Sequence, residues 1–243
     1  MSSTELSITS YSLEDLTEKE NLSWAVGKIH ENLDKGNLTG IANAFYENTK
    51  IGKHGVPFIK IKGLTNILRT GDAGNARYIV DHGYKNVLSS PYIVTIDGDE
   101  YISGPSLVGL IQARIGYTLG TTKQYLDVAY IYYQRIIDSP SVRDLKEKFL
   151  LDITKKRSDL KSKRIDTYGI TKCELSGATF VTRGVVDFAH IDSVFSHPEK
   201  ALDIDNGLII LGRIHRELTS LHIHDFSGLY DFCKANGYST AWA

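Results

Sequence analysis

Apolar residues recur at helical spacing through most of the first 165 residues. From Leu13 to Leu33 they follow one another every two to six positions, along one side of a projected helix. Such spacing is typical of a helix that buries one face. Together with proline and glycine as boundary signals, it predicts helices at residues 12–33, 39–47, 105–114, 121–137 and 141–164.

Two shorter stretches have the composition of β-strands. Residues 56–61 are rich in apolar and β-branched side chains. Residues 91–103 hold two such runs on either side of Asp97-Gly98, a pair that favours a type I′ hairpin turn. We therefore expect a mainly helical N-terminal region with a small hairpin or sheet.

The pattern changes in the last third of the chain. Two apolar runs, at 185–189 and 208–211, have the length of strands, and a helical pattern follows the second run. A last helix is expected at 229–235. The whole pattern predicts an α+β protein with an N-terminal region at 1–165, suited to DNA recognition or dimerisation, and a second domain at 166–243.

Charge and cysteine content narrow the class of protein. The formal net charge is −1, so composition alone indicates neither a nucleic-acid-binding nor a membrane-surface protein. Two cysteines cannot build a disulfide framework or a four-cysteine zinc ribbon, and they suit a reducing compartment. There is no secretory signal pattern and no apolar run of the roughly 18 residues that a membrane span needs. We expect a soluble, cytoplasmic protein without membrane contacts.

Positive charge is concentrated in residues 155–164, where six basic residues accompany one acid. Two interpretations stay open for this run: a solvated helix face, or a surface that contacts phosphates. The run leads directly into a histidine-rich region, where phosphate contacts would assist a hydrolytic site. The candidate nucleic-acid-binding residues are Lys155, Lys156, Arg157, Lys161, Lys163 and Arg164.

The C-terminal region holds most of the residues suited to catalysis. Five of the eight histidines lie here: His190, His197, His215, His222 and His224. His190 follows the first apolar run, Asn206 precedes the second, and His215 lies four residues after it. A strand, a loop, a second strand and a helix would bring these three side chains together. A neutral imidazole is a suitable general base near pH 7, and a divalent cation would stabilise charge on a phosphate.

Four blocks of this region resemble the HNH endonucleases of the ββα-metal superfamily. They are the turn 173–177 (CELSG), the block 187–191 (DFAHI), the block 205–211 (DNGLIIL) and His215. Each block alone is weakly specific, but all four occur in the order of the family. The resemblance covers no other part of the chain.

The resemblance implies a C-terminal ββα-metal module and assigns its catalytic residues. His190 would be the general base, and Asn206 would fix the loop geometry beside it. His215 would be a metal ligand on the helix. The implied cofactor is a divalent metal, Mg²⁺ first and Mn²⁺ as the alternative.

One position departs from the family pattern. Many HNH modules carry an Asp or His directly before the base as a metal ligand, where this chain has Ala189. Asp187 lies two residues earlier on the same strand face, because side chains alternate along a strand. Asp187 is therefore the second candidate metal ligand. The alternative is a strand-edge carboxylate held by backbone amides.

Two further histidines, His222 and His224, alternate along a stretch that is expected to be a strand. They could form a metal-binding pair or belong to a structural strand after the helix, and we favour the strand. Many relatives carry an Asp just after the helix, where this chain has Thr219. A metal ligand from this part of the chain is therefore not expected.

Together these features predict a metal-dependent endonuclease that hydrolyses DNA phosphodiester bonds. A free-standing module of this kind behind an unrelated N-terminal region resembles restriction enzymes and other defence or phage nucleases. Cutting both strands with one site per chain would require a homodimer. Two other classes stay open: a non-catalytic nucleic-acid-binding protein that keeps the HNH scaffold, and a structural or protein-interaction role led by the tyrosine-rich helices.

Overall fold

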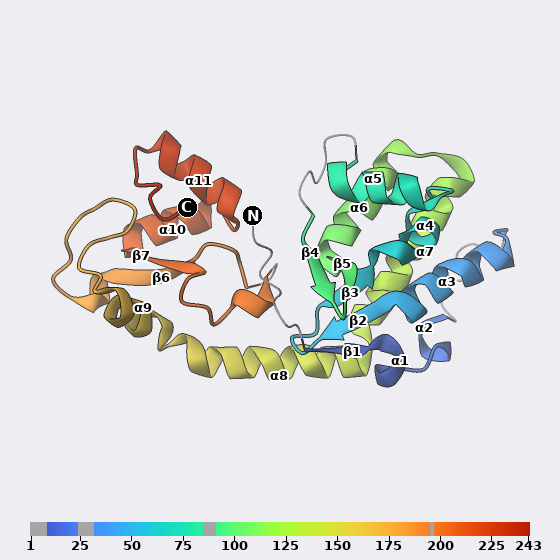
Figure 1. The fold of residues 1–243 in the computed structure, drawn as a ribbon, viewed down its shortest axis with the longest axis horizontal. Coiled ribbons are helices and arrows are strands. Elements are labelled where there is room, and N and C mark those ends of the chain that lie inside the picture. Colours follow the sequence, from blue (N-terminus) through green and yellow to red (C-terminus); the bar gives the residue numbers. More distant parts are fainter. Residues whose placement is uncertain (1–8, 24–31, 85–90, 195–196) are drawn as a thin grey trace. The chain divides into compact units, whose positions relative to one another are not determined.

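The protein is described as a computed structural model, in which the placed residues are 9–23, 32–84, 91–194 and 197–243. The chain divides into two compact units, Met1–Phe149 and Leu150–Ala243 (Figure 1). Helices and antiparallel strands occur in both units, which confirms the α+β prediction.

The first unit contains an antiparallel sheet in the order β1-β2-β3-β5-β4. Its strands are β1 (Ser10–Ser12), β2 (Thr49–Gly52), β3 (Pro57–Lys60), β4 (Ile93–Ile96) and β5 (Asp99–Ser103). Asp97 and Gly98 both have positive φ, as the predicted type I′ turn between β4 and β5 requires. The sheet is larger than the predicted hairpin because β1 and β2 extend it beyond β3.

Helices cover one face of this sheet. They are α1 (Leu13–Leu16), α2 (Glu20–Ser23), α3 (Lys35–Asn48), η1 (Ile61–Gly63), α4 (Leu64–Leu68), α5 (Ala73–His82), α6 (Gly104–Tyr117) and α7 (Gly120–Asp138). Ile59 and Ile102 on the covered face join the main core with Phe45 of α3 and Tyr132 of α7. Alternate strand residues such as Phe58 belong to a smaller apolar cluster on the opposite face.

The predicted helix at 12–33 is wrong within the described residues 9–23. The chain leaves the helix at Thr17, whose φ of −156° and ψ of 144° are extended, and α2 begins only at Glu20. The remainder of that prediction falls largely on 24–31, outside the described residues. The other predicted helices of this unit are confirmed as α3, α6 and α7.

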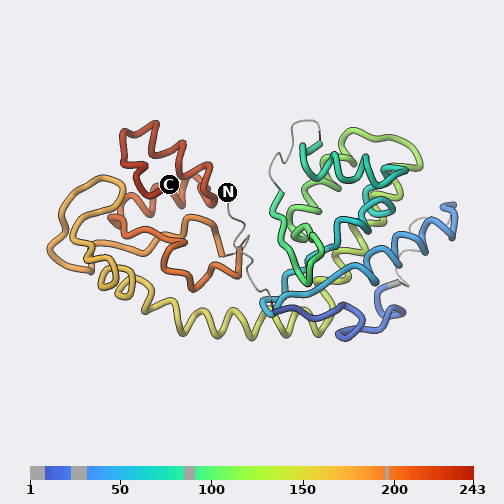
Figure 2. The backbone as a smooth tube through the Cα atoms, in the orientation of Figure 1, coloured from blue at the N-terminus to red at the C-terminus, as the bar shows by residue number. Residues whose placement is uncertain are grey.

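A second correction concerns the long charged helix predicted at 141–164. It is two helices, α8 (Pro140–Arg157) and α9 (Leu160–Tyr168), and the unit boundary falls within α8. Ser158 and Asp159 separate them, and both residue types compete with helical backbone hydrogen bonds. Figure 2 shows the chain path from α8 into α9.

The second unit is built on an antiparallel pair, β6 (Val186–His190) and β7 (Gly207–Leu211). Its other elements are η2 (Arg183–Val185), η3 (Pro198–Lys200), α10 (Gly212–Ser220) and α11 (Phe226–Ala235). On one face, Ala189 of β6 packs with α10 and α11 residues such as Ile214 and Phe232. On the other, Val186 and Ile209 pack against Ile165 of α9. This contact places all of α9 in the second unit, which begins at Leu150 and not at the predicted boundary after residue 165.

A buried ion pair joins α9 to β7. Arg164 donates from Nε and Nη2 to the two carboxylate oxygens of Glu174, at 3.0 and 2.7 Å, and from Nη1 to the Ile204 carbonyl at 2.7 Å. Glu174 also accepts the backbone N–H of Ile209 at 2.6 Å. The two side chains are 10% and 20% exposed, so the pair is largely shielded from water.

None of the helices in the described ranges combines the length and apolar character that crossing a membrane requires.

Replacing Glu174 by alanine should lower the free energy of unfolding by about 3 kcal/mol, because it leaves the buried Arg164 guanidinium with only the exposed Asp205 carboxylate, 3.7 Å away, as a counter-charge. Urea denaturation followed by circular dichroism measures this change. Asp166→Ala, which breaks an exposed ion pair with Arg183, is the matched control and should have little effect. Equal midpoints for the two variants would contradict this role of Glu174.

Candidate functional site

Three of the predicted site residues, Asp187, His190 and His215, line one cleft of about 350 Å³ within the second unit, whereas Asn206 does not line it. At the connection from α8 to α9, one part of it is lined by Arg157, Ser158, Leu160 and Lys161. β6 contributes Asp187, Phe188 and His190, and α10 contributes His215. The cleft therefore combines a basic segment with a carboxylate and two imidazoles.

Asp187 and His215 are brought together although they are 28 residues apart in sequence. His215 donates from Nδ1 to Asp187 Oδ2 at 3.2 Å. Because a carboxylate only accepts, Nδ1 carries the proton when no metal is bound, and a metal held by both groups would replace that proton. The two side chains are 44% and 40% exposed, so ligands can reach both of them.

The pair has donor types that suit a divalent cation. A carboxylate oxygen and an imidazole nitrogen are common ligands, and Mg²⁺ usually takes few protein ligands while water and phosphate oxygens complete its shell. Among the described residues, no group of three His, Cys, Asp or Glu side chains converges here or elsewhere. The residues present thus fit a metal held by Asp187 and His215 together with solvent or substrate oxygens.

His190 lies at the end of β6 and has a defined tautomer. Its Nε2 is 3.0 Å from the Ala201 carbonyl oxygen, which can only accept. Nε2 therefore carries the proton in the neutral ring, and Nδ1 keeps its lone pair. Burial lowers the pKa of His190 below its ordinary value of 6.5, and the charges of Arg157 and His215 act in the same direction. The ring is consequently neutral near pH 7, as a general base requires.

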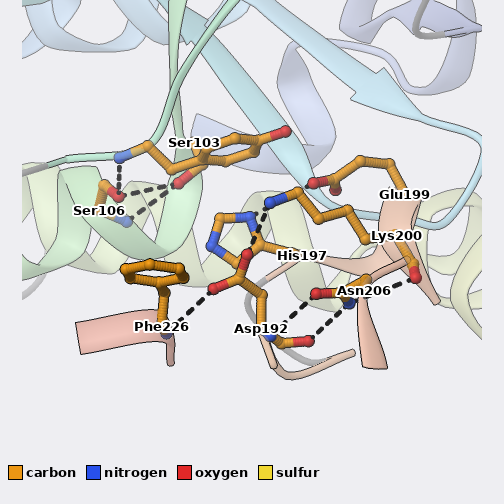
Figure 3. Close-up of polar contacts among 9 residues, drawn as sticks. Ser103, Ser106, Asp192, His197, Glu199, Lys200, Asn206 and Phe226 are labelled. Carbon is orange, nitrogen blue, oxygen red and sulfur yellow. Dashed lines mark hydrogen bonds and ion pairs between the residues drawn. The ribbon is translucent and has the colours of Figure 1, made fainter. Parts of the chain in front are cut away.

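Asn206 holds the loop that carries the hydrogen-bond acceptor of His190 (Figure 3). Its Oδ1 accepts the Asp192 N–H at 3.0 Å, and its Nδ2 donates to the carbonyls of Asp192 at 3.0 Å and Lys200 at 3.3 Å. Ala201, whose carbonyl accepts from His190, is the next residue. Asn206 is 6% exposed. Its geometry is that of a positioning residue and agrees with the predicted role in fixing the loop.

Lys200 and Asp192 strengthen the same loop. The Lys200 ammonium lies 2.6 Å from Asp192 Oδ2, and Asp192 Oδ1 accepts the backbone N–H of Phe226 at 3.3 Å (Figure 3). The loop is thereby tied to the first residue of α11.

Gly207 permits an aromatic contact beside His190. In the register of the strands it lies opposite His190. A Cβ at Gly207 would overlap the Phe188 ring. That ring lies edge-on to the His190 imidazole, with centroids 5.0 Å apart. The absence of a side chain at Gly207 therefore allows Phe188 to support the imidazole.

The six predicted nucleic-acid-binding residues have different environments. Arg164 is committed to Glu174, and Lys161 donates to the carbonyls of Arg183 and Val186, both at 3.0 Å. The exposed members are Lys155, Lys156, Arg157 and Lys163, of which Lys156 pairs with Asp152. Two of the six thus hold the fold, one forms an exposed ion pair, and Lys155, Arg157 and Lys163 are available to a partner.

The strand expected at His222 and His224 is wrong. His222 has a positive φ of 54°, and both residues lie in the connection between α10 and α11. His224 borders a second hollow of about 190 Å³, which His190 and His215 also line. Because Asp187 is not part of that lining, His224 does not join the Asp187–His215 pair.

Sequence reasoning missed the supports of the site. The role of the Ala201 carbonyl cannot be predicted from the residue type, because every residue has a backbone carbonyl. Phe188 and Glu174 lay inside recognised blocks, but only their contacts distinguish them from ordinary strand and turn residues.

Comparisons with known proteins found no match to this chain. No family model matches it, and neither a curated protein nor a solved structure does.

Gly207→Ala should destabilise the protein by about 2 kcal/mol, because the Phe188 ring must leave its position. Thermal unfolding measures the loss. Gly184→Ala is a suitable control, since a Cβ there meets no atom closer than 3.9 Å. Recovery of stability in a Gly207→Ala, Phe188→Leu double variant would confirm the cause, and a single variant as stable as Gly184→Ala would contradict it.

In metal-free protein, the His190 imidazole should titrate with a midpoint below 6.5, because burial disfavours its charged form. Its ¹⁵N shifts should show the proton on Nε2 in the neutral ring. Both properties can be read by NMR with ¹⁵N-labelled histidine, and His190→Gln identifies the signals. A midpoint above 6.5, or a proton on Nδ1, would contradict the site geometry.

Proposed function

We propose that the protein is a metal-dependent DNA endonuclease of the HNH type that hydrolyses phosphodiester bonds. One observation carries the proposal: His190, with a free Nδ1, and the Asp187–His215 pair line the same cleft. A base and a candidate metal-binding pair on one cleft form the minimum that phosphodiester hydrolysis requires.

The order of the elements supports the family assignment. An antiparallel strand pair is followed directly by α10, which packs on it, as the ββα-metal resemblance implies. The departure at Ala189 has a structural reason, because this residue is buried against α10. Asp187, on the same strand face, faces the cleft instead and can supply the missing carboxylate.

In the proposed reaction, His190 Nδ1 takes a proton from a water molecule, whose oxygen attacks the phosphorus atom. Ala201 holds the other ring nitrogen, so the base cannot turn away from the cleft. Asp187 and His215 would hold the metal. When bound, the metal would stabilise negative charge on the phosphate and its leaving oxygen. Asn206 acts indirectly, by holding the loop that carries Ala201.

The first unit would supply DNA-site selection, as in a restriction-type enzyme or another defence or phage nuclease. A homodimer would place two clefts on the two strands. The homodimer follows from the need to cut both strands with one site per chain, and the site-selection role from the resemblance to nucleases that join this module to an unrelated N-terminal region.

A second candidate is a nucleic-acid-binding protein that keeps this scaffold without catalysis. The observation that favours it is the small ligand set: within the described ranges, two side chains and not three converge at the metal position. A cleavage assay separates the two functions.

Purified protein should cleave plasmid DNA with Mg²⁺ or Mn²⁺ and lose this activity in EDTA. His190→Ala should reduce the rate by about 10²- to 10⁴-fold, because the base is removed. Asp187→Ala and His215→Ala should raise the metal concentration needed for half-maximal rate. Gel analysis of plasmid forms measures all three changes.

His82→Ala is the matched control, since His82 lies in the first unit and is exposed. It should cleave like the wild type. DNA binding without cleavage in any metal would favour the second candidate. Cleavage that survives His190→Ala would contradict the proposed base.

A further inference from the structure

Arg157 has a special position within the basic run. It is the last residue of α8, where Ser158 and Asp159 interrupt the helix. It lines the main cleft together with Asp187, His190 and His215. It also lines the second hollow, which His190 and His215 share. Lys155, Lys156 and Lys163 line neither of them.

The Arg157 guanidinium is available to a ligand. Arg164 and Arg183, by contrast, each pair with a carboxylate, Glu174 and Asp166 respectively. Within the part of the chain that the structure describes, Arg157 forms no ion pair, and it is exposed. Its location at the C-terminal end of α8 favours a positive charge, because that end of a helix is partially negative.

The groups around Arg157 make an anion the expected occupant. The cleft contains one carboxylate, Asp187, and that group already accepts a hydrogen bond from His215. Arg157 lies close enough to His190 for its charge to disfavour protonation of the ring. A guanidinium presents several N–H donors in a planar fork, which matches two oxygens of one phosphate.

We propose that Arg157 binds the non-bridging oxygens of the scissile phosphate, whereas the exposed lysines of the run contact phosphates that flank it. This assignment rests on the proposed function and names a further catalytic residue for it. Lys161 of the same run also lines the cleft, but its ammonium group donates to the carbonyls of Arg183 and Val186, so Arg157 is the better candidate.

The chemistry gives Arg157 a defined task. The water oxygen forms a bond to phosphorus as His190 Nδ1 takes its proton. One bridging P–O bond then breaks, and the leaving oxygen takes a proton from solvent. Negative charge builds on the non-bridging oxygens between these events. The Arg157 guanidinium would stabilise that charge more than it stabilises the bound substrate, so its loss should reduce the rate more than the affinity.

The test compares Arg157→Ala, Arg157→Lys and the matched charge control Lys155→Ala. Two quantities are measured: the plasmid cleavage rate at saturating protein, and the affinity for a short DNA duplex by fluorescence anisotropy in EDTA. Arg157→Ala should lower the saturated rate by about 100-fold, with no greater loss of affinity than Lys155→Ala. Arg157→Lys, which keeps the charge without the fork, should lie between Arg157→Ala and the wild type.

Lys155→Ala should show the opposite behaviour. It should weaken duplex binding and reduce the salt slope by about 1, and its saturated rate should fall far less than that of Arg157→Ala. Thymidine 5′-(p-nitrophenyl phosphate), which has no flanking phosphates, gives a second readout. Hydrolysis of this diester should fall further with Arg157→Ala than with Lys155→Ala.

If the wild-type protein is active and Arg157→Ala and Lys155→Ala have equal saturated rates, the assignment of Arg157 to the scissile phosphate is overturned, but the proposed function is not. Wild-type protein that cleaves no DNA in any metal would overturn the proposed function, and this assignment with it. Circular dichroism and thermal unfolding verify that each variant is folded, which the exposure of Arg157 and Lys155 leads us to expect.

Discussion

The antiparallel pairing of β6 with β7 is the constraint on which the candidate site depends. Its register places His190 opposite Gly207 and sends Asp187 and Ala189 toward α10. A slip of one residue would turn Asp187 to the other face, which packs against α9. The apolar residues on the two faces oppose such a slip, since those of β6 and β7 are buried on both sides. The geometry of a polar site is thus set by hydrophobic packing.

Polar groups then refine what packing sets in place. Asn206 spans the ends of its loop, and the Ala201 carbonyl of that loop selects the tautomer of His190. Asp187 selects the tautomer of His215 in the same way. His190 keeps one nitrogen for its orientation and leaves the other unbound, whereas His215 faces Asp187 with the nitrogen that a shared metal would use. Burial lowers the pKa of His190, so its position in the fold keeps the ring neutral near pH 7, as the proposed role of base requires.

The arginines of this unit have two different roles, an internal ion pair and an exposed position on the cleft, and composition cannot distinguish them. Arg164 is enclosed by Glu174 and the Ile204 carbonyl, and it joins α9 to β7. Arg157, seven residues earlier, has no such partner in the described chain and borders the cleft. The break between α8 and α9 separates the two. One arginine therefore holds the scaffold on which the other can meet a ligand.

The local patterns of the sequence determined most elements: the Asp97-Gly98 turn, the periodic helices α3, α6 and α7, and the strands that carry His190 and follow Asn206. These depend on neighbouring residues, whose spacing is visible in one dimension. Only tertiary structure decided where helices are interrupted at Thr17 and Ser158, and which basic residues stay free. It also decided that the Ala201 carbonyl orients His190. The physical reason is that burial, ion pairing and backbone hydrogen bonds join residues far apart in the chain, and their free energies override local propensity.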